Sequence, residues 1–187
     1  MSTPADTPTR ATRIRELYEA KARAELAEAD RLCPGSDVVA WRGDVLAPVM
    51  VVKGMPGPAE AAGGEALSGA DGDAVAKALT ALGWREGQVF FTLSRPDIAL
   101  DEGSCASRLR HQIEAVDPRV VLALDEVATA DVARSLQLEV LSAGASVLVD
   151  GRRVVALTEF EAALGDEKRK RAAWGSLRSA RADGPLY

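Results

Sequence analysis

Two charged residues follow predicted buried strands and are the strongest candidates for chemistry in this chain. Lys53 comes directly after the apolar run at 49–52, and Asp125 comes directly after the predicted strand at 119–124. Ligands of parallel α/β sheets bind at the carboxyl ends of the strands, so both side chains stand where a site is expected. A buried lysine with a lowered pKa can act as a base or a nucleophile, whereas charged groups of this kind often have only a structural role.

Histidine and cysteine are scarce. His111 is the only histidine, and it lies in a predicted helix away from the apolar face that contains Leu109 and Ile113. Cys33 and Cys105 are the only cysteines, which is too few for a disulfide-stapled fold or for a complete four-ligand metal site. We therefore expect a solvated histidine and two free thiols.

The composition predicts one soluble domain spanning residues 1–187. A chain of 187 residues with 47% hydrophobic side chains is long enough for one well-buried core. It has no run of about eighteen apolar residues, and its first ten residues lack the apolar centre of a secretory signal. We expect a cytoplasmic protein that does not bind membranes. The formal net charge of −5 opposes non-specific attraction to nucleic-acid phosphates, so such binding would need a local basic patch.

The order of apolar runs predicts an N-terminal helix at about 8–32 and an α/β core at about 37–181. The helix should end before Pro34, and its predicted buried stripe is Ile14, Leu17, Tyr18, Ala22, Ala29 and Leu32. In the core, helical and strand patterns alternate, and Asp150-Gly151 is typical of a hairpin turn. This alternation predicts a three-layer α/β/α sandwich with a mainly parallel, four-stranded central sheet.

A spaced set of turn residues follows the strand at 49–52, namely Pro56, Gly57, Glu60, Gly64, Gly69 and Gly72. In this spacing the chain resembles the uracil-DNA glycosylase superfamily, most closely its iron–sulfur branch called family four, over about Asp30 to Trp174. The resemblance implies a glycosylase-like fold. It also implies a former substrate pocket at Gly54, Met55, Pro56, Gly57, Leu67, Thr92 and Leu93.

The reactive positions of that family are replaced in this chain. Gly54 stands where relatives have a water-handling acid, and Leu67 stands where a phenylalanine stacks on the flipped base. Thr92 is retained, but Leu93 replaces the asparagine that reads the base edge, and no histidine lies at 157–161. We predict that uracil excision has been lost.

The two cysteines can be compared with the cluster ligands of the same family. Relatives hold an iron–sulfur cluster with four thiolates, and Cys33 and Cys105 match two of these positions. Asp30 stands at the first of the four cysteine positions. The third cysteine is missing, and Ser94 stands before the Arg-Pro pair that follows this cysteine in relatives. We predict that the cluster is lost, that the protein has no cofactor, and that the two remaining thiols lie close together.

In this fold the strands that end at Lys53 and Asp125 are neighbours, and relatives usually have glycine at both positions. The preferred interpretation is an ion pair that partly fills the old pocket, and the alternative is a new catalytic pair. Glu60 is a further candidate at the same rim, together with Thr92 and Asp97.

A basic run near the C-terminus is the candidate nucleic-acid contact, formed by Lys168, Arg169, Lys170 and Arg171. Acids surround Leu164 in the loop before it and would repel phosphates. The hypotheses are a catalytically degenerate glycosylase-like protein with weak DNA or small-ligand binding, a protein-interaction module without a nucleic-acid role, and an enzyme that uses Lys53 and Asp125.

Overall fold

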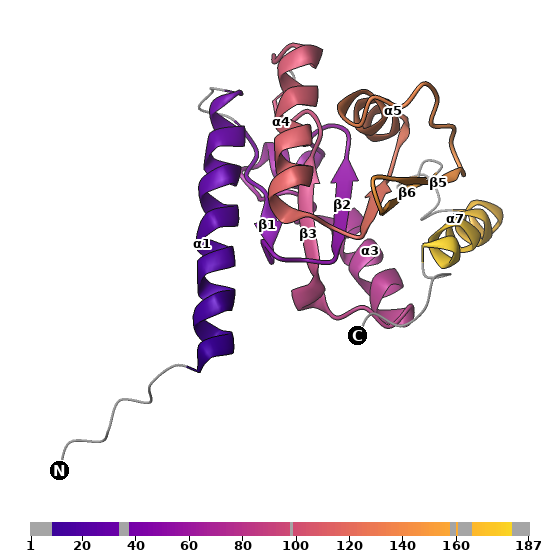
Figure 1. Ribbon diagram of the computed structural model, residues 1–187. Coiled ribbons are helices and arrows are strands. Elements are labelled where there is room, and N and C mark those ends of the chain that lie inside the picture. Colours follow the sequence, from indigo (N-terminus) through magenta and orange to yellow (C-terminus); the bar gives the residue numbers. More distant parts are fainter. Residues whose placement is uncertain (1–8, 34–37, 98, 158–159, 161–165, 181–187) are drawn as a thin grey trace.

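The computed structural model describes residues 9–33, 38–97, 99–157, 160 and 166–180. Helices and strands alternate through most of this part of the chain (Figure 1). In chain order the elements are α1 (Arg10–Arg31), β1 (Arg42–Gly43), β2 (Val49–Lys53), α2 (Pro58–Ala61), α3 (Ala70–Ala81), η1 (Glu86–Gln88), β3 (Val89–Leu93), α4 (Glu102–Val116), β4 (Val120–Ala123), α5 (Glu126–Ser135), β5 (Ser146–Val149), β6 (Arg152–Ala156) and α7 (Glu167–Ser179).

The strands form one sheet in the order β1-β3-β2-β4-β6-β5. The four central strands run parallel to their neighbours, whereas β1 and β5 pair antiparallel at the two edges. The predicted α/β class is confirmed, but the sheet is mixed and has six strands rather than four. The two-residue strand β1 is too short to produce a hydrophobic pattern, and β5 was counted only as part of a hairpin.

Helices cover both faces of the sheet, as in a three-layer sandwich. Alternate residues of β2 enter two separate cores, with Val51 on one face and Val52 on the other. The first core is closed by residues of α3 and α7, and the second by residues of α1, α4 and α5. Because β2 is buried on both faces, its sequence is an uninterrupted apolar run ending in Lys53.

The predicted hairpin is confirmed between β5 and β6. Val149 pairs with Arg152, and the two intervening residues both have positive φ, 48° at Asp150 and 78° at Gly151. Two such residues make a type I′ turn, whose twist matches that of the strands it joins. The Asp-Gly signature therefore predicted the position of this turn, and the structure adds its type.

The predicted buried stripe of α1 is only partly correct. Ala22, Leu26 and Ala29 are buried, whereas Ile14, Leu17 and Tyr18 are exposed, as is Leu32 at the C-cap. The N-terminal half of the helix extends past the end of α4 and the sheet (Figure 1). Periodicity shows which residues share a face, but it does not show where the neighbouring surface ends. Among the described residues, no helix combines the length and the apolar character required to cross a bilayer.

Candidate functional site

The carboxyl ends of β2 and β3 are joined by backbone hydrogen bonds beyond the last paired residues. Lys53 pairs with Leu93 in the parallel ladder. Ser94 N then donates to Lys53 O at 2.8 Å, and Arg95 N donates to Gly54 O at 2.9 Å. This edge of the sheet is therefore a rigid base for the side chains that follow it.

Lys53 forms a buried ionic cluster with two carboxylates that follow it in the chain. Its Nζ atom lies 2.6 Å from Asp71 Oδ2 and 3.4 Å from Glu60 Oε1. Glu60 belongs to the short helix α2, and Asp71 lies in the first turn of α3. The three side chains are at least nine-tenths buried, so the cluster is held away from bulk water. We refer to Lys53, Glu60 and Asp71 as the ionic cluster.

Glu60 also organises the turn around it. Its carboxylate accepts from Gly57 N at 3.0 Å and from Leu67 N at 2.9 Å, in addition to its contact with Lys53. A Cβ atom at Gly57 would lie 2.7 Å from Lys53 Nζ, so a side chain there would displace the lysine. The absence of a side chain at Gly57 thus leaves space for the ammonium group of Lys53.

Asp71 is brought to the cluster by an unusual loop. Leu67 adopts a φ of 53°, and its carbonyl oxygen accepts from Arg42 Nη2 at 2.7 Å. Gly72 packs against this carbonyl so closely that a Cβ atom would lie 1.8 Å from Leu67 O. Asp71 Oδ1 in turn accepts from Gly72 N at 2.9 Å. The sequence contained no local pattern that pairs Asp71 with Lys53, and our prediction missed it.

The surroundings of Lys53 keep it protonated. Burial lowers the pKa of its ammonium group, but the hydrogen bond and charge of Asp71, together with the charge of Glu60, outweigh that effect and raise the pKa above 10.5. This direction is opposite to the lowered pKa that a lysine base or nucleophile requires. The hypothesis of a catalytic Lys53 stays a prediction.

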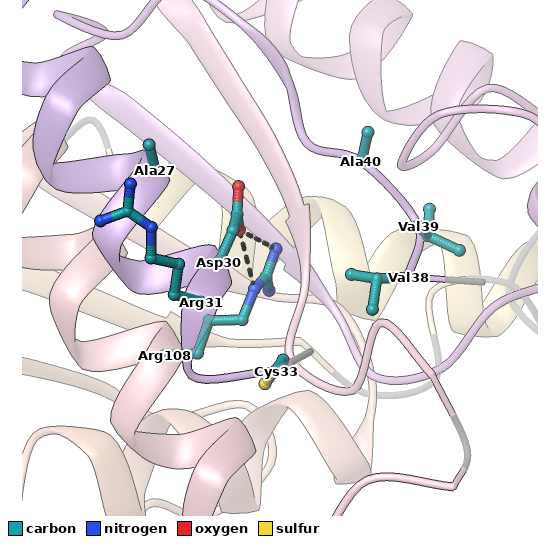
Figure 2. A pocket seen from close by; sticks show the side chains of 8 residues that line it. All are labelled: Ala27, Asp30, Arg31, Cys33, Val38, Val39, Ala40 and Arg108. Atoms are coloured by element: carbon teal, nitrogen blue, oxygen red, sulfur yellow. Dashed lines mark hydrogen bonds and ion pairs between the residues drawn. The ribbon is translucent and has the colours of Figure 1, made fainter. Parts of the chain in front are cut away.

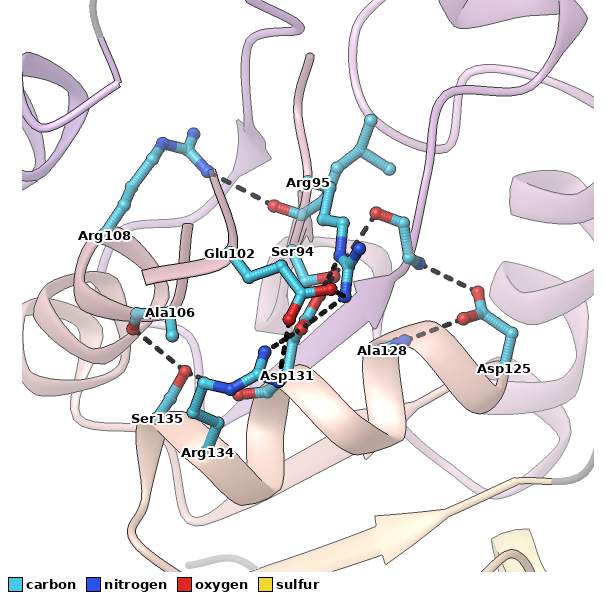
Figure 3. A network of polar contacts seen from close by, with 12 residues as sticks. Ser94, Arg95, Glu102, Ala106, Arg108, Asp125, Ala128, Asp131, Arg134 and Ser135 are labelled. Atoms are coloured by element: carbon cyan, nitrogen blue, oxygen red, sulfur yellow. Dashed lines mark hydrogen bonds and ion pairs between the residues drawn. The ribbon is translucent and has the colours of Figure 1, made fainter. Parts of the chain in front are cut away.

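The expected ion pair between Lys53 and Asp125 is replaced by other contacts. Asp125 is the N-cap of α5, where it accepts from Ala128 N at 2.8 Å, and it also accepts from Gly54 N at 2.8 Å (Figure 3). A Cβ atom at Gly54 would lie 2.6 Å from Asp125 Oδ1, which leaves no room for an acidic side chain there. Asp125 therefore joins β2 to α5 through backbone amides.

The other predicted pocket residues lie in different surroundings. Leu67 and Leu93 are fully buried in the first core. Thr92 is buried among residues of the opposite layer, where its hydroxyl donates to Gln112 Oε1 at 2.8 Å. Met55 is 40% exposed. Leu67, Leu93 and Thr92 are thus enclosed by the protein, whereas Met55 faces solvent.

A groove lies beside the ionic cluster, with a volume of about 600 Å³. Pro56 and Pro96 contribute apolar walls, and Glu60, Glu65 and Asp97 contribute carboxylates. The described lining residues include no lysine, arginine or histidine. Its electrostatic field therefore favours ligands with positive charge or several hydrogen-bond donors, and it disfavours phosphates. Glu60 and Asp97 were predicted at this rim, whereas Glu65 was not.

A second pocket of about 470 Å³ lies between the end of α1 and α4 (Figure 2). Arg108 is fully buried at its wall, and its Nε atom donates to Asp30 Oδ1 at 3.0 Å. Its Nη1 atom donates to Leu93 O at 3.2 Å. Asp30 also accepts from Trp41 Nε1 at 3.1 Å. Asp30 is thus half of an ion pair with Arg108.

Cys33 and Cys105 are buried and hydrogen-bonded to each other through their side chains, which confirms that they lie together. Burial raises the pKa of Cys33 and raises that of Cys105 to about 11, so both thiols are protonated at neutral pH. An iron–sulfur cluster requires four thiolates. Two thiols beside the Asp30 and Arg108 ion pair do not supply this ligand set, and no group of three or more His, Cys, Asp or Glu residues that could hold a metal ion occurs in the described ranges.

A polar network surrounds Asp131 on α5 (Figure 3). This fully buried carboxylate accepts from Ser94 Oγ and Arg95 Nε, both at 2.8 Å, and from Arg134 Nη1 at 3.0 Å. The hydrogen bond to Asp131 is the main reason that the pKa of Arg95 lies well above its ordinary value. Glu102 binds both arginines from outside. Ser94 therefore has a structural role.

The basic run belongs to α7, as predicted. Lys168 and Arg171 are exposed, and so is Arg178 two turns further along the helix. The guanidinium of Arg178 lies 5.8 Å from the ring centroid of the half-buried Trp174. The side chains of Arg169 and Lys170, and residue Leu164, lie outside the part of the structure that is described. His111 is exposed, and its Nδ1 lies 2.8 Å from Ser107 O.

The comparisons with known proteins add no relative to these observations. No model of a known protein family matches the chain, and no curated protein matches it either. The resemblance to the uracil-DNA glycosylases thus stays a prediction from its motifs.

Proposed function

We propose that this chain is a non-catalytic binding protein of glycosylase-like ancestry, and that the groove beside Glu60 is its ligand site. The observation that carries this proposal is the ionic cluster. It places a protonated, doubly paired lysine at the carboxyl end of β2, where an enzyme of this ancestry would need a residue that handles water. The cluster also holds the turn that forms one wall of the groove.

Loss of uracil excision is part of the same proposal. Gly54 has no side chain and no space for one, so it cannot orient a water molecule. Leu67 and Leu93 are buried and offer no aromatic face or hydrogen-bonding group to a base. Release of uracil from DNA by the purified protein, abolished by Leu93→Asp, would refute this part of the proposal.

The ligand class follows from the charges in the groove. Glu60, Glu65 and Asp97 would attract an amine or a guanidinium and repel nucleic-acid backbone. Glu60 is already neutralised in part by Lys53, so the rim residue Glu65 is the better contact for an incoming cation. A small cationic molecule with an apolar portion fits both the carboxylates and the proline walls.

The test uses spermidine and arginine amide as probes in titrations followed by amide NMR spectra of the full chain. We expect chemical-shift changes at residues 56–65 and 96–97, with affinity that falls as salt is added. Glu65→Gln should weaken binding severalfold, whereas Glu139→Gln, a matched exposed control outside the groove, should leave it unchanged. Shifts that map elsewhere, or the absence of shifts with both probes, would overturn the ligand class.

A second candidate function is weak contact with nucleic acid through α7. Lys168, Arg171 and Arg178 share its exposed side, and Trp174 provides an aromatic ring beside them. The test is binding to single- and double-stranded DNA at low salt. Combined Lys168→Ala and Arg178→Ala substitutions should remove binding, whereas Lys77→Ala with Arg85→Ala should not. No binding at low salt would eliminate this candidate.

A further inference from the structure

The N-terminal half of α1 carries an apolar surface that no described residue covers. Ile14, Leu17 and Tyr18 are 44%, 71% and 60% exposed. With Leu32, this one helix holds four of the seven large hydrophobic residues that are exposed in the described part of the chain. Exposed apolar surface is therefore concentrated on α1, and such concentration is typical of an interaction surface.

Helical spacing places two of these residues, Ile14 and Leu17, in a seam of exposed residues with a charge at each end. Steps of four and three residues place them on one side of the helix. In order, the seam consists of Arg10, Ile14, Leu17, Lys21, Ala24 and Glu28. All six residues are exposed. The seam is basic at its N-terminal end, apolar in its first half and acidic at its C-terminal end.

We propose that two copies of this chain associate through this seam, with their α1 helices antiparallel. In that arrangement Arg10 of one copy faces Glu28 of the other, Ile14 faces Ala24, and Leu17 faces the methylene stem of Lys21. A twofold axis near Glu19 repeats each contact, so every seam residue has a complementary partner. A parallel arrangement would instead place Arg10 against Arg10 and Glu28 against Glu28, which is repulsive.

The charge pattern favours a second copy of this chain over an unrelated partner. The two oppositely charged residues that would pair across the interface, Arg10 and Glu28, both lie on α1. The ion pairs within α1, Lys21 with Glu25 and Arg31 with Glu28, do not prevent this association, since a carboxylate can bind a second cation. The apolar area is small, so we expect a dimer that dissociates on dilution and not an obligate one.

The test measures the mass of the full chain by sedimentation velocity over a wide range of concentrations. The parent should approach twice the monomer mass of 19.7 kDa as concentration rises. Arg10→Glu alone and Glu28→Arg alone should each be monomeric, since like charges then meet at both ends of the seam. Mixing these two variants should restore the dimer, because each copy then supplies the charge that the other lacks.

The controls separate association from folding. Arg23→Glu makes the same charge change as Arg10→Glu on an exposed residue of α1 outside the seam, and it should dimerise like the parent. Circular dichroism and the unfolding midpoint should be alike for all variants. A parent that stays monomeric at every concentration, or single variants that dimerise as well as the parent, would overturn the proposal. So would a mixture that remains monomeric.

Discussion

The Nζ atom of Lys53 lies 2.6 Å from Asp71 Oδ2, and both side chains are more than nine-tenths buried. These residues come from different elements, the end of β2 and the first turn of α3, so their contact fixes the path of the loop between them. Glu60 completes the arrangement from α2. A strand end, a short helix and the first turn of a longer helix are thus held together by one buried set of charges.

Lys53→Met should strongly destabilise the fold. Methionine keeps the apolar stem but leaves two buried carboxylates without their cation, and breaking a buried pair on one side costs about 3–5 kcal/mol. The measurement is the free energy of unfolding from urea titration. Lys77→Met, at an exposed position on α3, should change it by less than about 0.5 kcal/mol. Equal stability of the two variants would contradict the structural role of the cluster.

The same cluster predicts a loss of stability at alkaline pH. The folded state raises the pKa of Lys53 above the unfolded value of 10.5, so its contribution is fully present below that pH. It is lost as the pH rises through the higher folded value, because the unfolded lysine then releases its proton first. The difference in free energy of unfolding between the parent and Lys53→Met should therefore shrink above about pH 10.5. If this difference in the free energy of unfolding grew with alkaline pH, it would contradict a raised pKa of Lys53 in the folded state.

The buried thiols should react slowly in the folded protein. Raising the pKa of Cys105 from 9.0 to about 11 lowers its thiolate fraction about a hundredfold at neutral pH, and burial restricts access further. Alkylation by iodoacetamide, followed by mass spectrometry, should be at least that much faster in denaturant than in buffer. Rapid modification of the folded chain at Cys105 would show that the thiol is neither buried nor protonated.

Protein prepared without oxygen should contain no iron and show no visible absorbance. The reason is that the chain has two cysteines, so it cannot supply four thiolates. The measurement is iron content per chain together with the visible spectrum. Stoichiometric iron with cluster absorbance would contradict the assignment of this pocket.

Asp131→Asn should cost more stability than Ser94→Ala. Asp131 is a fully buried anion that accepts from Arg95 and Arg134 as well as from Ser94, so neutralising it leaves cations poorly paired, at about 3 kcal/mol. Ser94→Ala removes one hydrogen bond, at about 1 kcal/mol. Urea unfolding of both variants checks the order. The reverse order would show that the serine, not the carboxylate, supports the network.

The features predicted correctly are those with a local or periodic signal. The apolar run at β2 and the Asp150-Gly151 turn each follow from neighbouring residues. The partner of Lys53 does not follow from neighbouring residues, because Asp71 reaches Lys53 only through the positive φ of Leu67 and the close approach of Gly72. Asp125 stands both after a strand and at the start of a helical pattern, so its position suits a site residue or a helix cap, and only its contacts identify it as the N-cap of α5.

The two edges of the sheet limit how chains of this protein can join. β1 offers two residues and β5 offers four, and both run antiparallel to the strands inside them. A short edge gives an incoming strand few hydrogen bonds, so strand addition from another molecule gains little free energy. Growth of an open-ended fibre through the sheet is thereby discouraged. A contact between helical surfaces has no such open edge and can close on a fixed number of subunits.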